Sequence, residues 1–351
     1  MKILFAPIAK GNPYQNQLKL HLEKLGAKVT FVEDNRPRTL LRMAVLGPRF
    51  DVLHLHWTNS YTLDGSFVFS LVKTLIFLSS LQVMALRGTQ VVWTVHNLSE
   101  HERRHAGFEA WLLRRLSKFC GRIIVHNEYC RDEAVRLWQD AVHDKYRVIP
   151  HGNYIDAYPN EMSKELSRNT LGLPHDKKMF LCFGLIRRYK GLEKVIEAFA
   201  SDELQDSILL IAGRPLDNGI KNQLQQKVQG HHNIRLFLEH IPDENVQLFM
   251  KACDAVIFSF TDIFTSGSVV LAMSFGKPVI SPDLPSLRPF VEDGGAVTYS
   301  NGNVKSLVNV ILGLKDAEMI SFGKKNKDLA LRYGWDSIAN STLEVYEQIK
   351  K

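Results

Sequence analysis

A short basic loop carries the clearest chemistry in the sequence. Arg187, Arg188 and Lys190 follow the apolar run 179–184 and precede an apolar helical pattern over 192–199. In a sheet of parallel strands such a loop lies at the carboxyl edge, where ligands bind. Because Arg offers a bidentate fork and Lys a point charge, we expect Arg187 and Lys190 to clamp a diphosphate. The alternative is an ordinary solvated basic loop.

A second candidate anion site is a run of small polar residues before an apolar helix. Thr265, Ser266, Gly267 and Ser268 precede the predicted helix 269–275. The first N–H groups of a helix have no acceptor within it and lie at the positive end of its dipole, so this turn could face the same anion. Simple capping by Thr265 or Ser266 is the alternative, and both roles are compatible.

Histidines gather at the ends of predicted strands in the first half of the chain. The five are His54, His56, His96, His126 and His151. Their placement predicts a cleft lined with imidazoles. His96 is the candidate catalytic residue, because a neutral imidazole at a strand end can bond a hydroxyl or orient a reacting group. Asn97 and Glu100 follow it.

Several common catalytic motifs are absent. The sequence contains no D-x-D, G-x-S-x-G, H-E-x-x-H or G-x-x-x-x-G-K-[ST]. These absences argue against a metal-bridged diphosphate, a serine hydrolase, a zinc protease and a P-loop NTPase. We expect no metal and no cofactor, so side chains and helix dipoles would meet the diphosphate charge. The four scattered cysteines suggest core residues in a reducing cytosol.

The elements that position these residues alternate between strand and helix along the whole chain. The predicted strands are 2–7, 28–32, 51–57, 90–96, 122–127 and 146–152, then 179–184, 207–213, 233–239, 254–260 and 277–282. Continuous Val/Ile/Leu strands separated by helical patterns predict α/β domains with parallel sheets covered on both faces. A polar stretch over 153–174 divides them. We expect two Rossmann-like, doubly wound domains, 1–158 and 159–334, facing across a cleft at the strands' carboxyl ends.

The positive charge is concentrated in the first half. The 351 residues carry a formal charge of +7. Residues 159–351 hold 23 basic and 23 acidic residues, whereas residues 36–122 hold 12 basic and 5 acidic ones. The surplus lies away from the predicted diphosphate clamp, so it predicts a second anionic partner. We expect residues 36–122 to contact an anionic membrane surface. Nucleic acid is disfavoured, because this stretch lacks interleaved aromatic stacking platforms.

One predicted helix, 67–86, is long and apolar enough to cross a membrane, with Lys73 as its single charge. Ser66, Ser70, Lys73, Thr74 and Ser80 fall on one stripe. We expect this stripe to be the narrow solvated face of a largely buried core helix. An interfacial helix and a true membrane span are the alternatives.

The order and spacing of these motifs resemble bacterial glycosyltransferases of the GT-B fold, in particular the glycogen-synthase-like family 4. The resemblance is carried by 11–14, the strand HLHW ending at Trp57, 94–97, 150–152, 183–191, 211–213 and 266–280. It implies sugar transfer from a nucleotide-diphosphate sugar to a glycan or polyprenyl-linked acceptor. The first domain would bind the acceptor, the second would bind the donor, and the helix 335–351 would cross back onto the first domain.

The resemblance assigns roles to residues at matching positions. Arg187, Lys190, Thr265, Ser266, Gly267 and Ser268 would bind the donor. Gly11, Asn12, Tyr14, Trp57, Asn97 and His151 would line the acceptor side, and His96 would contact the transferred sugar. The loop 11–14 is also compatible with an ordinary turn that has Pro13 at the first helical position.

Two departures from the family pattern affect the donor site. Leu185 occupies the position of the usual Arg, so that role would pass to Arg187. Ile263 and Leu271 occupy the positions of the E-x7-E glutamates, so the family's mode of ribose recognition does not carry over. The T-S-G-S form resembles a sub-branch of exopolysaccharide-type transferases.

Two other functions remain open from the sequence. One is a sugar-nucleotide epimerase or hydrolase on the same fold. The other is a non-catalytic module that binds anionic membranes through a basic amphipathic helix bearing Arg114, Arg115, Lys118 and Arg122. For the transferase, we expect a cytoplasmic protein located peripherally at the inner face of the cell membrane.

Overall fold

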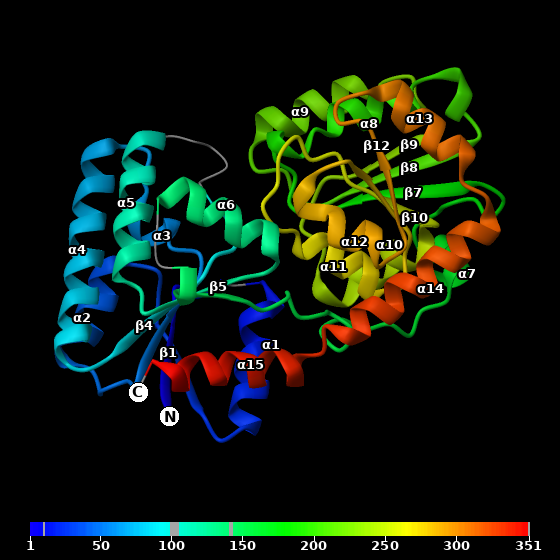
Figure 1. Cartoon of the computed structure of the whole chain (residues 1–351). Coiled ribbons are helices and arrows are strands. Elements are labelled where there is room, and N and C mark those ends of the chain that lie inside the picture. The colour runs from blue at the N-terminus through cyan, green and yellow to red at the C-terminus, as the bar shows by residue number, and fades with distance from the viewer. Residues whose placement is uncertain (10, 99–104, 140–142, 350–351) are drawn as a thin grey trace. The chain divides into compact units, whose positions relative to one another are not determined.

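The computed structural model describes residues 1–9, 11–98, 105–139 and 143–349. It divides into two compact units, Met1–Gly152 with Gly334–Lys351, and Asn153–Tyr333 (Figure 1). The first junction lies slightly before the predicted boundary at residue 158. Each unit is described by itself below.

The first unit is built on a six-stranded parallel sheet with the strand order β2-β1-β3-β4-β5-β6. The strands are β1 (Lys2–Ala6), β2 (Lys28–Phe31), β3 (Val52–Leu55), β4 (Gln90–Thr94), β5 (Arg122–Val125) and β6 (Tyr146–Val148). The helices are α1 (Pro13–Lys24), α2 (Pro37–Leu46), α3 (Asn59–Thr62), α4 (Phe67–Leu86), α5 (Ala106–Phe119), α6 (Glu128–Trp138) and α15 (Trp335–Gln348). This alternation is the one that the apolar runs predicted.

The C-terminal helix α15 packs beside α1 in the first unit. Trp335 covers Gly152 so closely that a Cβ there would lie 2.5 Å from the indole. The same helix pairs Asp336 with His21 at 2.6 Å and brings Tyr346 to within 2.6 Å of His54. Buried packing and polar contacts together hold α15 against the sheet.

The second unit has a six-stranded parallel sheet with the order β12-β11-β10-β7-β8-β9. The strands are β7 (Lys178–Phe183), β8 (Ser207–Ala212), β9 (Ile234–Phe237), β10 (Ala255–Ile257), β11 (Val279–Pro282) and β12 (Ala296–Tyr299). The helices are α7 (Lys164–Thr170), α8 (Leu192–Phe199), α9 (Asn218–Lys227), α10 (Val246–Ala252), α11 (Gly267–Ser274), α12 (Arg288–Glu292), α13 (Val304–Gly313) and α14 (Asp316–Arg332).

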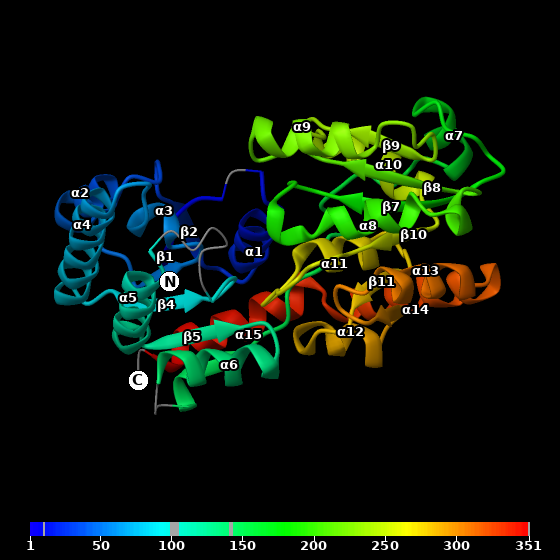
Figure 2. The ribbon, with the colours of Figure 1, turned by 90° about the horizontal axis from the view of Figure 1, so that it is seen from above.

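Alternate residues of the central strands point to the two faces of this sheet. Along β7, Met179 and Leu181 join one buried cluster with residues of α10, α11 and α14. Phe180 and Cys182 join the other, with residues of α8, α9 and α13. Figure 2 shows helices on both sides of the strands. The sheet is therefore doubly wound, as its apolar strands predicted.

The edge strand β12 was not among the predicted strands. It is short and only half-buried, so it lacks the continuous apolar run that marks the other strands. Its entry is held by Asn326, whose side chain accepts a hydrogen bond from the Gly295 N–H and donates one to the Gly295 carbonyl. A side chain at Gly295 would lie 1.9 Å from the carbonyl oxygen of Phe322.

Two expectations about the helices of the first unit are wrong. The predicted solvated stripe of α4 faces inward, because Ser70, Thr74 and Ser80 are buried. Their hydroxyls donate to backbone carbonyls one turn back or in the preceding segment. The apolar side chains of 67–75 mostly face solvent, whereas Phe77, Leu81 and Met84 are buried. Arg122 does not share a helix face with Arg114, because it begins β5 after α5 has ended.

Candidate functional site

Two of the predicted donor residues, Lys190 and Ser268, meet beside Gly184, the residue directly after β7. A Cβ built on Gly184 would lie 3.4 Å from Lys190 Nζ and 3.8 Å from Ser268 Oγ. Gly184 has a φ of +97°, a conformation that glycine adopts without strain. The glycine turn, the basic loop and the start of α11 therefore share one place at the carboxyl ends of the strands.

The basic loop is held close to the sheet by its own backbone. Arg188–Lys190 forms a single 3-10 turn that ends at Gly191, with a φ of +61°. A side chain at Gly191 would lie 2.4 Å from the Ser259 carbonyl, and the Ser259 hydroxyl donates to the Lys190 carbonyl. Lys190 Nζ donates to the Phe183 carbonyl at 3.3 Å. These contacts fix the ammonium at the end of β7.

Burial lowers the pKa of Lys190 from its usual 10.5 to about 8, and the positive charge of Arg187 adds to this effect. Cys182 acts in the opposite direction. An anion that binds beside this ammonium stabilises its charged form. Lys190 and Arg187 are thus near enough for their charges to influence each other.

Helix α11 starts with Ser266 as its N-cap, whose hydroxyl accepts a hydrogen bond from the Val269 N–H at 3.3 Å. Gly267 and Ser268 form the first turn, and their N–H groups have no acceptor within the helix. Thr265 precedes the cap and is partly exposed. Capping and anion binding are compatible here, because the cap uses the N–H of Val269.

Ile263 and Leu271, at the positions of the family's glutamate pair, offer no polar side-chain group to a ligand. Leu271 is 6% exposed and belongs to the core beneath the sheet, and Ile263 packs against the same core. A ligand ribose would therefore need other partners than these two side chains.

Tyr14 is the centre of the polar cluster in the first unit. Its ring is 2% exposed and contacts His56, His96, His126 and His151 edge-on, with centroids 4.8 to 5.9 Å apart. Burial raises the pKa of its phenol, which bonds to Thr94. The predicted gathering of imidazoles at the strand ends is thus present. The histidines do not line an open surface of this unit, however, because none of the five is more than 7% exposed.

His126, His96 and His56 form a hydrogen-bonded chain. The backbone carbonyl of Ile149 at one end of the chain fixes which nitrogen of each ring carries the proton. His126 Nδ1 must donate to the Ile149 carbonyl at 2.9 Å, so its Nε2 accepts from His96 Nδ1 at 3.4 Å. His96 Nε2 in turn accepts from His56 Nδ1 at 3.3 Å. His56 Nε2 is then a buried lone pair with no hydrogen-bond partner among the described residues.

Burial keeps these imidazoles neutral. It lowers the pKa of His126 to about 4 and those of His54 and His151 to about 3, while His56 and His96 fall well below the usual value. Both ring nitrogens of His96 face other histidines. Its predicted contact with a sugar would therefore involve the edge or face of the ring.

A small pocket opens beside this chain. Its lining includes His96, Asn97, Trp57 and Glu109. Trp57 stacks on His96 with ring centroids 3.9 Å apart. Its free volume is only about 10 Å³, about the space of one water molecule, so it can take a hydroxyl group but not a whole sugar ring. Glu100, which was expected to accompany His96, lies outside the described residues.

Glu109 is the site residue that sequence reasoning missed. It is a carboxylate only 3% exposed, on the inward face of α5. The signal was present in the pattern, because Glu109 shares the apolar stripe of Leu112, Leu113 and Leu116. An acidic residue among core positions of a helix indicates a function or a specific partner.

The loop at Gly11 and Asn12 makes the contacts of an ordinary helix N-terminus. Gly11 has a φ of +77°, Asn12 caps α1 by accepting from the Tyr14 N–H, and Pro13 occupies the first turn. The loop positions Tyr14 under the histidines.

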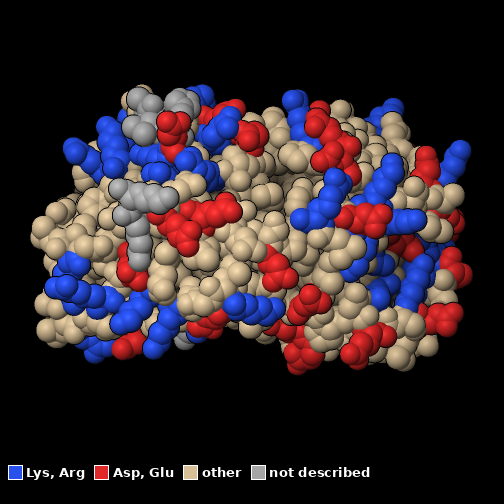
Figure 3. All heavy atoms as spheres, turned by 60° about the horizontal axis from the view of Figure 1, so that its bottom comes forward, with Lys and Arg blue, Asp and Glu red and all other residues tan. Residues whose placement is uncertain are grey.

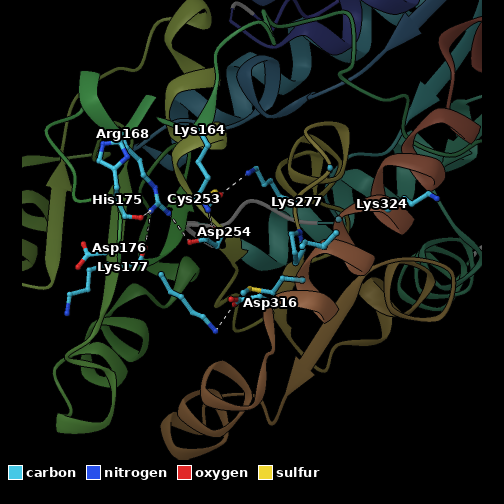
Figure 4. A pocket seen from close by; sticks show the side chains of 16 residues that line it. Lys164, Arg168, His175, Asp176, Lys177, Cys253, Asp254, Lys277, Asp316 and Lys324 are labelled. Atoms are coloured by element: carbon cyan, nitrogen blue, oxygen red, sulfur yellow. Dashed lines mark hydrogen bonds and ion pairs between the residues drawn. The ribbon is translucent and has the colours of Figure 1, made fainter. Parts of the chain in front are cut away.

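A second cavity of about 520 Å³ lies at the amino ends of β7, β10 and β11 (Figure 4). Its cations are largely paired. Arg168 and Lys164 contact Asp254, and Lys178 contacts Asp316. Arg168 also donates to three carbonyls around the cavity. The network ties the strand starts to α7 and α14, at the edge opposite to Gly184.

Among the described residues, no group of three or more His, Cys, Asp or Glu could hold a metal ion.

Comparison with known proteins identifies the same architecture. Residues 12–155 match the family model for Glycosyltransferase Family 4, and residues 163–330 match the model for Glycosyl transferases group 1. Solved structures with the same fold include HepE of Anabaena in complex with UDP and glucose, at a TM-score of 0.74, 16% identity and coverage of 99% of this chain and 100% of that one. Sucrose-phosphate synthase from Thermosynechococcus elongatus has a TM-score of 0.77 at 16% identity, with 99% of both chains covered.

Curated relatives extend the match over most of the chain. A GDP-mannose:glycolipid 4-beta-D-mannosyltransferase of Xanthomonas campestris pv. campestris is 28% identical, covering 79% of this chain and 71% of its own. A phosphatidyl-myo-inositol mannosyltransferase of Mycobacterium leprae is 26% identical, covering 86% and 74%. These matches do not favour an epimerase, a hydrolase or a non-catalytic module. The chain belongs to the family 4-like glycosyltransferases of the GT-B fold and is an enzyme that transfers a sugar from a nucleotide sugar.

Proposed function

We propose that the enzyme transfers a hexose from a nucleotide-diphosphate sugar to the glycan of a lipid-linked acceptor. The observation that carries this proposal is the convergence of Gly184, Lys190 Nζ and Ser268 Oγ at the start of α11. Mannose is the proposed sugar, because the two relatives described above are named as mannosyltransferases and one of those names specifies GDP-mannose and a glycolipid.

The donor diphosphate binds between the basic loop and α11. Lys190 and Arg187 supply positive charge, and the N–H groups of Gly267 and Ser268 supply hydrogen bonds at the positive end of the helix. When the bond from the sugar to the diphosphate breaks, negative charge grows on the leaving oxygen. Fixed donors stabilise that charge more in the transition state than in the substrate. No metal or cofactor is required for this step.

The acceptor hydroxyl binds in the pocket of the first unit that Trp57, Asn97 and Glu109 line. The hydroxyl loses its proton as it attacks the anomeric carbon. Glu109 is the carboxylate in that lining, and we assign it the role of accepting the proton. His96 holds Trp57 in place by stacking and contacts the sugar with its ring.

The acceptor's lipid requires the enzyme to work at a membrane. The basic surplus in residues 36–122 supports peripheral binding at the anionic inner face of the cell membrane from the cytoplasm. This proposal concerns charge, and it is independent of the sugar's identity.

The direct test measures nucleotide release by the purified protein from GDP-mannose, UDP-glucose and other nucleotide sugars. Each donor is tested with and without a polyprenyl-diphosphate-linked glycan in vesicles. Acceptor-dependent release, with a matching sugar gain on the glycan by mass spectrometry, is the expected result. Equal release without acceptor, or no release with any donor, would overturn the proposal.

A further inference from the structure

Helix α4 turns several hydroxyl residues toward the interior and many apolar side chains toward solvent. Ser70, Thr74 and Ser80, its buried hydroxyl residues, are at most 1% exposed and face the unit's interior. Each satisfies its hydroxyl locally, on the carbonyls of Ser66, Thr62 and Ile76, so the inward polar stripe carries no unmet hydrogen bond. Phe77, Leu81 and Met84 are buried on the same face, so the inward side of the helix is mixed polar and apolar.

The outward face is apolar over the N-terminal half of the helix. The exposed apolar residues of its N-terminal half are Phe67, Val68, Phe69, Leu71, Val72 and Leu75, which are 40 to 65% exposed. Three of them sit on consecutive positions at the helix start. The same helix is the one described segment long and apolar enough to cross a membrane, and most of it is unburied. Contiguous exposed apolar surface of this kind marks a binding site rather than a folding core.

Aromatic contacts extend this surface onto α5. The ring centroid of Phe67 is 5.5 Å from that of Phe108, and Phe108 stacks on Trp111 at 5.8 Å. Trp111 is 45% exposed, and the guanidinium of Arg115 lies over its ring at 5.8 Å. We define the α4–α5 surface as Phe67, Val68, Phe69, Leu71, Val72, Leu75 and Trp111.

The charges around the α4–α5 surface identify its partner. Arg114, Arg115 and Lys118 are exposed on α5, whose one acidic residue, Glu109, is buried. On α4, Lys73 is already paired with Asp64. In Figure 3 the edge of the first unit formed by α2 and α4 is largely tan, with blue Lys and Arg side chains bordering it. An apolar face with a tryptophan and a basic border matches an anionic bilayer, in which lipid tails cover the face and headgroups meet the cations.

We propose that the α4–α5 surface inserts into the interfacial layer of an anionic lipid bilayer, with Arg115 and Lys118 at the headgroups. The inference rests on the proposed function only for its purpose, which is to keep the enzyme beside a lipid-linked acceptor. A second copy of the chain is the competing occupant. It is disfavoured, because two such surfaces would bring like charges together.

Flotation tests the proposal with vesicles of phosphatidylcholine alone and of phosphatidylcholine with one-third phosphatidylglycerol. Full-length wild type is expected to float with the mixed vesicles. The double variant Phe69→Asp/Val72→Asp, at exposed positions that folding does not require, is expected to lower the partition coefficient at least tenfold. Its matched control is Leu312→Asp/Ile320→Asp, at equally exposed apolar positions of the second unit, which is expected to float like wild type.

Two further readouts separate the possible failures. The Arg115→Gln/Lys118→Gln variant is expected to lose the preference for phosphatidylglycerol. A water-soluble short-chain acceptor should be glycosylated equally by the wild type and the Phe69→Asp/Val72→Asp variant, whereas an acceptor in vesicles should not. If the Phe69→Asp/Val72→Asp and Leu312→Asp/Ile320→Asp variants float equally, the proposed bilayer contact is wrong. It is also wrong if the wild type is a dimer that the Phe69→Asp/Val72→Asp change dissociates. Absence of transfer to either acceptor would instead overturn the proposed function.

Discussion

Lys190 and Ser268 approach the same point from different elements, because a side chain at Gly184 would have its first carbon 3.4 Å from the ammonium and 3.8 Å from the hydroxyl. They are far apart in sequence and lie on the basic loop and on α11. A fixed cation and the first turn of a helix thus surround one small space. The space beside Gly184 gives the donor site a testable geometry, and the φ of +97° explains why a glycine occurs there.

Replacing Lys190 with alanine should reduce turnover by about two to three orders of magnitude, because it removes a charge that stabilises the leaving diphosphate. Thermal unfolding should change little, since the ammonium makes one weak backbone contact. Lys194→Ala is the matched control, as this lysine is exposed on α8 and pairs with Glu197. Steady-state nucleotide release measures both. A Lys190→Ala enzyme as fast as wild type would remove the lysine from the mechanism.

The affinity for the donor should depend on pH above neutrality. The pKa of Lys190 is about 8 in the free protein, so the ammonium loses its proton as the pH rises through 8. A bound diphosphate favours the charged form, so binding takes up a proton at high pH. The donor dissociation constant should rise about tenfold between pH 7 and pH 9.

Isothermal titration in buffers of different ionisation enthalpy measures that proton uptake directly. Lys190→Arg keeps its charge over the whole range, so its affinity should be flat between pH 7 and pH 9. A wild-type affinity that is equally flat would contradict the assignment.

Gly184→Ala should abolish donor binding at a small cost in stability. The alanine is strained at a φ of +97°, at about 1–2 kcal/mol, and its methyl group occupies the space beside Lys190 Nζ. Gly230→Ala is the control, because Gly230 has a φ of +83° in the same unit and open space around it. The two variants should lose similar stability in urea, and only Gly184→Ala should lose the thermal shift given by the nucleotide sugar. Loss of that shift in both would indicate strain alone.

The sequence predicts the strands well where burial is complete and less well elsewhere. Runs such as 179–184 are apolar throughout, so their identity as central strands follows from composition. The strand β12 is half-buried and leaves no such run. The donor loop was predictable, since Arg187 and Lys190 directly follow a strand. What brings Lys190 beside Ser268 is the strand order, which the sequence does not contain.

The orientation of α4 could not be predicted, for a specific physical reason. Periodicity assigns the apolar stripe to the interior, but Ser70, Thr74 and Ser80 can be buried at little cost, because each hydroxyl finds a nearby carbonyl. We propose that a lipid bilayer covers the apolar side, and periodicity within the chain carries no signal for such a partner. Glu109 is the opposite case. It is a charged residue at a core position of its helix, and the expectation that core positions are apolar could have singled it out.

Glu109→Gln should lower the catalytic constant by about 100-fold or more and leave donor binding unchanged, since the amide keeps the shape of the side chain but cannot accept the acceptor's proton. Glu128→Gln is the control, because Glu128 is exposed at the start of α6 and pairs with Arg131. Single-turnover kinetics with preloaded donor separates chemistry from binding. An unchanged single-turnover rate for Glu109→Gln would move the base elsewhere, and a lost thermal shift would show a structural role.

The neutral histidine chain should make the first unit acid-sensitive. His126 has a folded pKa of about 4, whereas an unfolded histidine titrates near 6.5. Between these values the unfolded state binds more protons, so stability is complete above pH 6.5 and falls as the pH drops toward 4. His54 and His151, with folded pKa values of about 3, extend the same loss to lower pH. All five tryptophans lie in this unit, so their fluorescence in urea titrations reports its unfolding alone.

We expect the free energy of unfolding to fall by several kcal/mol between pH 7 and pH 4. His126→Gln should make this dependence on pH less steep, while lowering the free energy of unfolding at pH 7. A wild-type slope near zero would mean that these imidazoles are solvated or charged in the folded protein.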